Sequence, residues 1–245
     1  VNIVPATGWR KYVCVDHANA SGTKAAVFIA VDDSWNSLIY DEVYGPNMQL
    51  EQFVLAVKER LSIHEREMAE NEGRRASGLE QITLWPCDPS MRRKTENDAT
   101  LTIIQSYMQE AQLQQFSMPP YPAGADVDAG IDKMNWLLKN NQKGREDLPH
   151  MRVNPRCKNW RATAGAYIYD ERTGKPKDNQ DDHELDGTRY GTNTIYVGDF
   201  LLSKIRPNVE RSREEQIIYE LQESSHPNDF NDLLIDIGYS AEVLI

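Results

Sequence analysis

The stretch KYVCVDHANASGTKAAVFIAVDDSWNSLIYDEVY, residues 11–44, sets the architecture of the chain. It contains three runs of strand length that are rich in apolar residues, at 11–16, 24–31 and 37–44. The connections between the runs are short and consist mostly of turn-forming residues, which favours antiparallel neighbours. The sequence therefore predicts a three-stranded antiparallel meander near the start of the chain.

Helical and strand patterns alternate downstream of the meander. An apolar stripe at i, i+3, i+4, i+7 and i+11 predicts the first helix, and it consists of Leu50, Phe53, Val54, Val57 and Leu61. Strands are then expected at 81–87 and 113–117, and helices around 101–108 and 127–138. Because such alternation indicates parallel pairing, we expect an α/β fold whose mixed sheet is flanked by helices.

The last third of the chain carries two further patterns. Residues 160–169 and the turn at 172–174 are expected to form an added β-hairpin. The segment DDHELDGTRY, residues 181–190, opens a helix whose first turn is acidic, which the positive end of the helix dipole favours. We expect one domain over residues 1–200 and an acidic extension over residues 201–245.

Acidic residues outnumber basic ones, 38 to 27, and the formal net charge is -11. This composition excludes a uniformly basic nucleic-acid wrapper, so any contact with a polyanion must be local. Residues 152–177 supply such a region, because seven Lys or Arg stand there against two acidic residues. The tail from residue 208 is acidic instead, which suits docking to a basic protein surface or masking of a basic cleft.

Several function classes are excluded by what the sequence lacks. The three cysteines lie far apart, so neither a disulfide framework nor a cysteine-rich zinc site is expected, and a reducing intracellular setting is the default. No apolar run approaches the roughly 20 residues that span a bilayer, and no secretory signal is visible, so no membrane contact is expected. The G-x-x-x-x-G-K-[ST] motif is absent, so this chain should not hydrolyse ATP.

Carboxylates recur where predicted strands end and where the last helix begins. Asp16 and Asp88 each end a strand, while Asp181 and Asp182 open the late helix. If the two strands are adjacent and parallel, their carboxylates emerge at one sheet edge, where they repel each other unless a cation neutralises them. Hard oxygen ligands suit Mg²⁺ or Mn²⁺, and a pair of such ions can hydrolyse phosphodiesters. Taken singly, each Asp more often has a structural role in a turn or cap.

Three motifs in this order resemble those of one protein family. The strongest is DHELDGTRY at 182–190; CDPS at 87–90 follows a strand, and VD at 15–16 precedes a turn and KAA at 24–26. They are similar to the acidic motifs of the nuclease domain of the large terminase subunit, the genome-packaging motor of tailed phages and herpesviruses. The resemblance covers residues 12–197 and implies an RNase H-like fold.

The resemblance also implies a centre of two divalent ions, Mg²⁺ or Mn²⁺. Asp16 would bridge both ions, Asp88 would bind one, and Asp182, with or without Asp181, would bind the other. These carboxylates would thereby be the catalytic groups of phosphodiester hydrolysis.

Neighbouring residues have more open assignments. Asp186 is expected to pair with Arg189 and hold the helix rather than a metal. His183 is a ligand, a proton shuttle or an exposed neighbour of the site. Two departures from the family pattern are His17, which should point to the opposite sheet face, and Gly187, which should weaken its helix slightly.

Two basic regions are candidates for DNA contact. Arg92, Arg93 and Lys94 directly follow the second acidic motif, and Arg161 and Lys175 belong to the basic stretch expected as a hairpin. Each region is either a phosphate-binding surface or a solvated one, and the resemblance favours the first interpretation because the family hairpin guides DNA. His64, His150 and His226 have no partners at ligand spacing and are expected to be inert. Glu42 is expected at an edge or on the surface, with a place near the site as the alternative.

The function implied is a metal-dependent endonuclease that cuts concatemeric double-stranded viral DNA during genome packaging. By the same resemblance an ATPase motor would lie upstream in a longer protein, the portal protein and the small terminase subunit would be partners, and the host-cell cytoplasm would be the location. Alternatives are a Holliday-junction resolvase of the RuvC type or another RNase H-like nuclease, and a non-catalytic DNA-binding or assembly module of the same fold.

Overall fold

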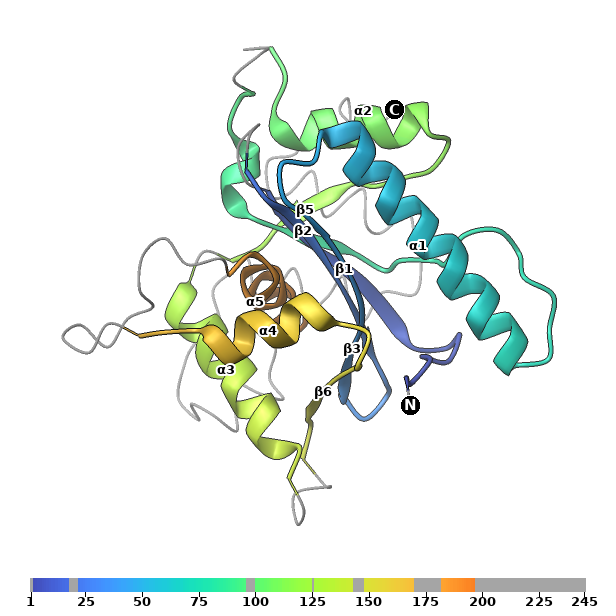
Figure 1. Ribbon diagram of the computed structural model, residues 1–245, viewed down its shortest axis with the longest axis vertical. Helices are drawn as coiled ribbons and strands as arrows, with labels where there is room; N and C mark the ends of the chain where they lie inside the picture. Colours follow the sequence, from blue (N-terminus) through green and yellow to red (C-terminus); the bar gives the residue numbers. More distant parts are fainter. Residues whose placement is uncertain are drawn as a thin grey trace, which may run out of the picture. The chain divides into compact units, whose positions relative to one another are not determined.

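The computed structural model describes residues 2–17, 22–95, 100–124, 126–142, 148–169 and 182–196. Within these residues six strands form one sheet in the order β5-β4-β1-β2-β3-β6 (Figure 1). The strands are β1 (Arg10–His17), β2 (Lys24–Val31), β3 (Ser37–Gly45), β4 (Trp85–Cys87), β5 (Pro120–Pro122) and β6 (Met151–Val153). The helices are α1 (Leu50–Asn71), α2 (Ile103–Leu113), α3 (Val127–Asn140), α4 (Lys158–Ala166), α5 (His183–Ile195) and the short 3₁₀ helix η1 (Pro89–Arg92).

The sheet is mixed, as the sequence predicts. β1, β2 and β3 form the antiparallel meander. β4 pairs in parallel with β1 and with β5, and β6 pairs in parallel with β3. The parallel strands are short and lie at both sides of the longer meander, so the expected α/β class with a mixed sheet flanked by helices is confirmed.

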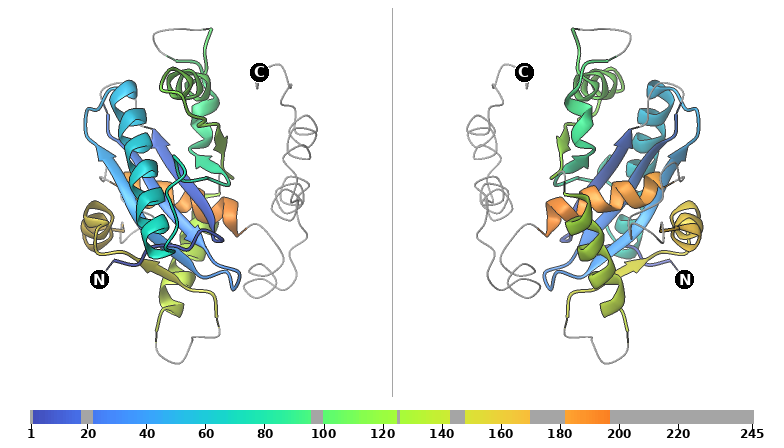
Figure 2. Two further views of the ribbon diagram at one scale, coloured as in Figure 1. Left: turned by 90° about the vertical axis from the view of Figure 1, so that its right-hand side faces the viewer. Right: turned by 90° about the vertical axis from the view of Figure 1, so that its left-hand side faces the viewer.

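The two faces of the sheet carry different layers (Figure 2). Residues of α1 and α2 pack with Val13, Val15 and Phe28 in one buried apolar cluster, because alternate strand residues point to the same face. The other face is covered by α5, where Gly187 and Gly191 approach Cys14 of β1. Side chains at alternate positions of the central strands therefore pack against α1 and α2 on one face, and those between them pack against α5 on the other.

Four elements differ from the sequence prediction, and one of them is the strand β6, which the sequence does not predict. α2 continues to Leu113, where the sequence predicts the start of a strand, and the next strand is β5 at Pro120–Pro122. Its prolines predict a loop, yet proline is tolerated on an edge strand, where fewer ladder hydrogen bonds are needed. The first arm of the expected hairpin is also wrong, because Lys158–Ala166 is the helix α4. The rest of that hairpin lies outside the described residues.

The chain divides into two compact units, Val1–Thr192 and Asn193–Ile245. The first unit contains the whole sheet and α1 to α4. Of the second, only residues 193–196 are described, so the expected boundary near residue 200 and the acidic extension lie beyond the described part and stay predictions. No helix in the described ranges is long and apolar enough to cross a membrane.

Candidate active site

The first two acidic motifs meet on adjacent parallel strands. Val15 of β1 is in register with Cys87 of β4, and the Asp88 backbone N–H donates to the Val15 carbonyl over 3.2 Å. Asp16 and Asp88 therefore leave the sheet at the same edge, as the sequence predicts. The side chain of Asp16 is buried and that of Asp88 is half-buried.

Asp88 also has the structural role that its position before a turn suggests. Its two carboxylate oxygens accept from the Ser90 backbone N–H and from the Ser90 hydroxyl, each over 2.7 Å. These bonds cap η1, the short 3₁₀ helix that follows β4. The cap fixes the orientation of the carboxylate, so a structural and a chemical role are compatible at this residue.

The third acidic motif reaches the same edge through α5. A Cβ atom on Gly187 would lie 3.2 Å from the Cys14 carbonyl oxygen, and one on Gly191 would lie 2.5 Å from the Cys14 Sγ. Both distances are too short for a side chain without adjustment, so the two glycines allow α5 to lie directly on β1. The helix start then faces the end of the strand, where the His183 Nδ1 and the Asp16 Oδ2 are 2.6 Å apart.

Gly187 is therefore better explained by close packing than as a departure that weakens the helix.

Asp186 pairs with Arg189, as expected from the sequence. Its Oδ1 accepts from the Arg189 Nε over 3.0 Å and from a terminal guanidinium nitrogen over 2.8 Å. Asp181 lies outside the described residues. Asp182 immediately precedes α5 and is half-buried.

The carboxylates from the three motifs act on one another electrostatically. Burial raises the pKa of Asp16, and the charges of Asp186 and Asp88 raise it further, although the His183 hydrogen bond opposes them. Burial, Asp186 and Asp16 together raise the pKa of Asp182 to about 6, with His183 again opposing. The four carboxylates therefore form one cluster, called here the acidic cluster: Asp16, Asp88, Asp182 and Asp186.

The acidic cluster has little cationic compensation. Among the described residues, Asp186 is its one member with an arginine ion pair, and Asp16 is the one with a histidine contact. Like charges held at a low-dielectric edge favour the uptake of a proton or of a cation. Burial is the largest cause of the raised pKa of Asp16 and of Asp182, and the neighbouring carboxylates add to it.

The donor set fits a hard divalent cation. Carboxylate oxygens are the ligands that Mg²⁺ and Mn²⁺ prefer, and Asp16, Asp88 and Asp182 supply them from three elements. In the conformation described, and within the described ranges, no three His, Cys, Asp or Glu side chains are grouped closely enough to hold a metal ion. Asp181, which the sequence predicts as an additional ligand, is outside those ranges.

His17 lies on the opposite side of β1 from the acidic cluster, as predicted. Its Nδ1 is 2.9 Å from the hydroxyl of Tyr107, a buried residue of α2. Burial lowers the pKa of His17 to about 4, helped by the charges of Lys24 and Arg93. The ring is therefore neutral near pH 7 and serves as a packing and hydrogen-bonding contact between β1 and α2.

Three of the predicted DNA-binding residues, Arg92, Arg93 and Lys94, follow closely after Asp88. Arg92 ends η1, and Arg93 and Lys94 follow it; all three are exposed. Arg93 is close enough to affect His17 electrostatically, and the Lys94 ammonium donates to the Thr100 carbonyl over 3.0 Å. Arg161 is exposed on α4. Lys175 lies outside the described residues.

Glu42 is buried on the inner strand β3, so the expectation that it lies at an edge or on the surface is wrong. It is 6% exposed, and its carboxylate accepts from the backbone N–H groups of Asn159 and Trp160 over 2.7 and 2.8 Å. A negative charge at the first turn stabilises a helix N-terminus, so β3 anchors the start of α4. The partners are more than 110 positions apart, and no local signal in the sequence joins them.

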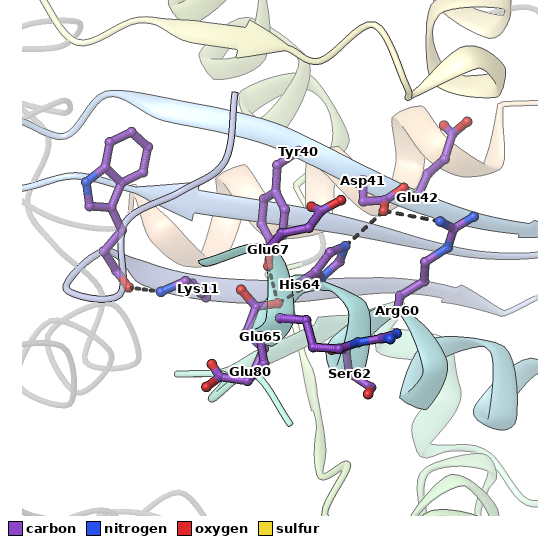
Figure 3. A network of polar contacts seen from close by, with 12 residues as sticks. Lys11, Tyr40, Asp41, Glu42, Arg60, Ser62, His64, Glu65, Glu67 and Glu80 are labelled. Carbon is purple, nitrogen blue, oxygen red and sulfur yellow. Dashed lines mark hydrogen bonds and ion pairs between the residues drawn. The ribbon is translucent and has the colours of Figure 1, made fainter. Parts of the chain in front are cut away.

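A second cluster of ionisable side chains lies on the α1 face of the sheet (Figure 3). His64 of α1 is 2% exposed; its Nε2 is 2.9 Å from the Asp41 Oδ2, and its Nδ1 is 2.9 Å from the Glu80 Oε2. The Tyr40 hydroxyl donates to the same Glu80 oxygen over 2.8 Å. The expectation that His64 is without partners is therefore wrong.

Arginine side chains complete this second cluster. Guanidinium nitrogens of Arg60 and Arg156 lie 3.5 and 3.6 Å from the Asp41 carboxylate. Tyr40 is the extra residue of a β-bulge, because Phe28 pairs with Asp41 and Ile29 with Ile39. The whole set is called here the histidine cluster: Tyr40, Asp41, Arg60, His64, Glu80 and Arg156.

Comparison with solved structures identifies the fold. No protein-family model matches the sequence, and the search of curated proteins gives no significant match. The nuclease domain of the P22 large terminase aligns with a TM-score of 0.56 and 17% identity, covering 80% of this chain and 86% of that domain. A large terminase from a thermophilic bacteriophage aligns with a TM-score of 0.52 and 20% identity, covering 81% of this chain and 43% of that protein.

The class of fold is therefore the RNase H-like α/β sheet, and within that class it is the form seen in large terminase nuclease domains. This confirms, at the level of the fold, the resemblance carried by the three acidic motifs. The chain spans less than half of the length of the thermophilic phage protein.

Proposed function

We propose that this chain is a divalent-metal-dependent endonuclease of the large terminase type, which cuts double-stranded DNA during viral genome packaging. The observation that carries the proposal is the convergence of Asp16, Asp88 and Asp182 at one edge of the sheet. The likeness of the fold to terminase nuclease domains supports it. Repulsion among the carboxylates also supports the proposal, because bound cations would relieve that repulsion.

Asp16, Asp88 and Asp182 would hold two divalent ions, Mg²⁺ or Mn²⁺. Such ions activate a water nucleophile and stabilise the leaving oxygen in phosphodiester hydrolysis. The residues of the chain prepare the site: Ser90 orients Asp88, His183 orients Asp16, and Arg189 holds Asp186 in an ion pair. Asp186 and His183 would thus act beside the ligands rather than in their place.

The wider assignment follows the same proposal. Double-stranded DNA would be the substrate, with Arg92, Arg93, Lys94, Arg161 and Lys175 contacting its backbone. The portal protein, the small terminase subunit and an ATPase motor would act with the nuclease in the complete packaging machine, in the cytoplasm of the host. The acidic segment 201–245 would dock to a basic surface of a partner.

The test is nicking of supercoiled plasmid DNA by the purified chain with Mg²⁺, with Mn²⁺ and with EDTA. Cleavage is expected with either metal and not with EDTA, and Asp16→Asn should abolish it. Asp132→Asn, which removes an exposed carboxylate of α3, is the matched control and should cut normally. Normal cleavage by Asp16→Asn would disprove the assignment of the site. A strong preference for four-way junctions over linear duplex would favour a resolvase instead.

A further inference from the structure

α4 is held firmly against the layer that carries the acidic cluster. The buried Trp160 donates from its Nε1 to the Thr188 hydroxyl of α5 over 2.8 Å. One turn later, the Thr163 hydroxyl donates to the Glu184 carboxylate over 3.4 Å. Together with the Glu42 contacts at its first turn, these bonds attach α4 to both α5 and β3.

The two helices run in opposite directions, which brings the end of α4 to the acidic cluster. The partner of residue 160 is residue 188, and the partner of residue 163 is residue 184. Continuing by one turn places Tyr167 beside the start of α5, where Asp182 lies. The pKa of Tyr167 agrees with this position, because burial, Asp182 and Asp186 together raise it to about 12. The phenol is therefore neutral at physiological pH.

The outward side of this segment combines cations, small residues and apolar side chains. Four exposed residues of α4 share one face at i, i+3, i+4 and i+7: Lys158, Arg161, Ala162 and Gly165. Directly after the helix, Ile168 is 55% exposed and Tyr169 is 43% exposed. The rings of Tyr167 and Tyr169 meet edge to face, with centroids 5.4 Å apart, so the two tyrosines support each other beside the exposed isoleucine.

We propose that this surface, called here the α4 track and consisting of Lys158, Arg161, Ala162, Gly165, Ile168 and Tyr169, grips duplex DNA next to the acidic cluster. Lys158 and Arg161 would contact backbone phosphates, and the small residues would let the backbone approach the helix. Ile168 and Tyr169 would enter the minor groove and contact deoxyribose and base edges. The inference rests on the proposed nuclease function, because it takes the same DNA as the ligand.

Charge and chemistry select this occupant. The acidic cluster repels a polyanion in the absence of metal, so a neighbouring cationic surface is needed to hold DNA there, and Lys158 and Arg161 supply it. Ile168 carries no hydrogen-bonding group in its side chain and cannot neutralise phosphate. Apolar side chains that proteins place against DNA act as wedges at base steps in the minor groove. Tyr169, the next residue in the chain, is also exposed and adds aromatic surface beside such a wedge.

The experiment measures the affinity of the full chain for a fluorescent 30-base-pair duplex in the Asp16→Asn background, where cleavage is blocked. Ile168→Ala combined with Tyr169→Ala should weaken binding about 10-fold, with an unchanged dependence on salt concentration. Arg161→Ala should instead lower the slope of log affinity against log salt by about one unit. Tyr169→Phe, which keeps the ring, should bind normally.

The matched control is Leu113→Ala, which removes an apolar side chain that is 78% exposed at the end of α2, and it should leave DNA affinity unchanged. Equal weakening by Leu113→Ala and by the double variant would overturn the proposal, as would normal binding by the double variant. Loss of self-association in sedimentation without loss of DNA affinity would also overturn it, since the track would then be a protein interface. If the wild-type chain neither binds nor cuts DNA, the proposed nuclease function itself fails.

Discussion

The acidic cluster and the histidine cluster each contain a histidine hydrogen-bonded to an aspartate of the central sheet, yet their electrostatics are opposite. In the histidine cluster, burial opposes ionisation of Asp41, but hydrogen bonds from His64 and the charge of Arg60 keep its pKa below the usual range. In the acidic cluster, burial and neighbouring carboxylates raise the pKa of Asp16 despite its bond to His183.

The difference separates a structural network from a site prepared for a ligand. In the histidine cluster, groups of both signs contact each other directly, with His64 between Asp41 and Glu80 and two arginines beside Asp41. In the acidic cluster, four carboxylates come together, and among the described residues Asp186 alone has an arginine partner. The folding of the rest of the domain must offset the repulsion among these carboxylates. Clusters of ionisable groups with shifted pKa values are characteristic of functional sites.

The largest expected effect is on catalysis, at Asp16. Asp16→Asn should reduce cleavage by about 10³-fold or more, because metal ions contribute several kcal/mol to transition-state stabilisation. The free energy of unfolding in urea should stay the same or rise, because repulsion from Asp88 and Asp186 is removed. A variant that loses activity only because it unfolds would contradict the contrast between the two clusters, and circular dichroism on the same sample tests this.

The next effect is on stability, at His64. Replacing His64 with Ala should lower the free energy of unfolding by about 3–5 kcal/mol, because Asp41 and Glu80 then stay buried without their shared partner. Nuclease activity per folded molecule should be retained, since His64 lies on the opposite face from α5. Urea unfolding gives the stability, and plasmid nicking at low temperature gives the activity. Specific loss of cleavage with normal stability would show that the two clusters are coupled.

The meander and β4 were predictable from the sequence, whereas β5, β6 and many of the polar contacts were not. Strand periodicity and short turns determine the meander, and the order of the motifs predicts that Asp16, Asp88 and Asp182 lie together. The roles of His64 and Glu42 were not predictable, because their partners come from distant elements and from a β-bulge that no local pattern marks. For residues 113–122 and 158–166, tertiary contacts overrode local propensity.

A smaller effect should follow from filling the contact between α5 and β1. Gly191→Ala places a Cβ atom 2.5 Å from the Cys14 Sγ and 2.9 Å from the Ile29 Cδ1. Such overpacking costs about 1–3 kcal/mol of stability. Because α5 carries Asp182, cleavage should fall together with stability.

Cys14→Ala provides the control for this packing. Added to Gly191→Ala, it removes the sulfur atom that the new methyl group meets, so it should restore part of both stability and cleavage. Gly165→Ala on α4, where an added Cβ meets nothing within 4 Å, should leave stability unchanged or slightly improved. Urea titrations of the single and double variants decide between local crowding and a general loss of helix flexibility.

The smallest effect concerns pH and isolates the charge on His64. Burial lowers the pKa of His64, but its hydrogen bonds to Asp41 and Glu80 outweigh burial, so the pKa lies above the usual value. A histidine whose pKa is raised in the folded state contributes stability that is complete below its unfolded pKa and is lost as pH rises through the folded pKa. The pKa of Asp41 is lowered, so its contribution is lost instead as pH falls through the folded value. The stability difference between wild type and His64→Gln should therefore be largest at pH values above the lowered pKa of Asp41 and below the unfolded pKa of His64. It should narrow as the pH rises through the raised pKa of His64 in the folded protein.

The comparison with His64→Gln is informative because the rest of the histidine cluster is common to both proteins. Arg60, Arg156 and Tyr40 also face the same carboxylates, so the difference in stability measures the imidazolium charge and not their contribution. Urea unfolding from pH 5 to pH 9 provides the measurement. A difference that widens with pH would show that His64 is neutral in the folded protein and that hydrogen bonds alone hold the cluster, which would remove the electrostatic contrast with the acidic cluster.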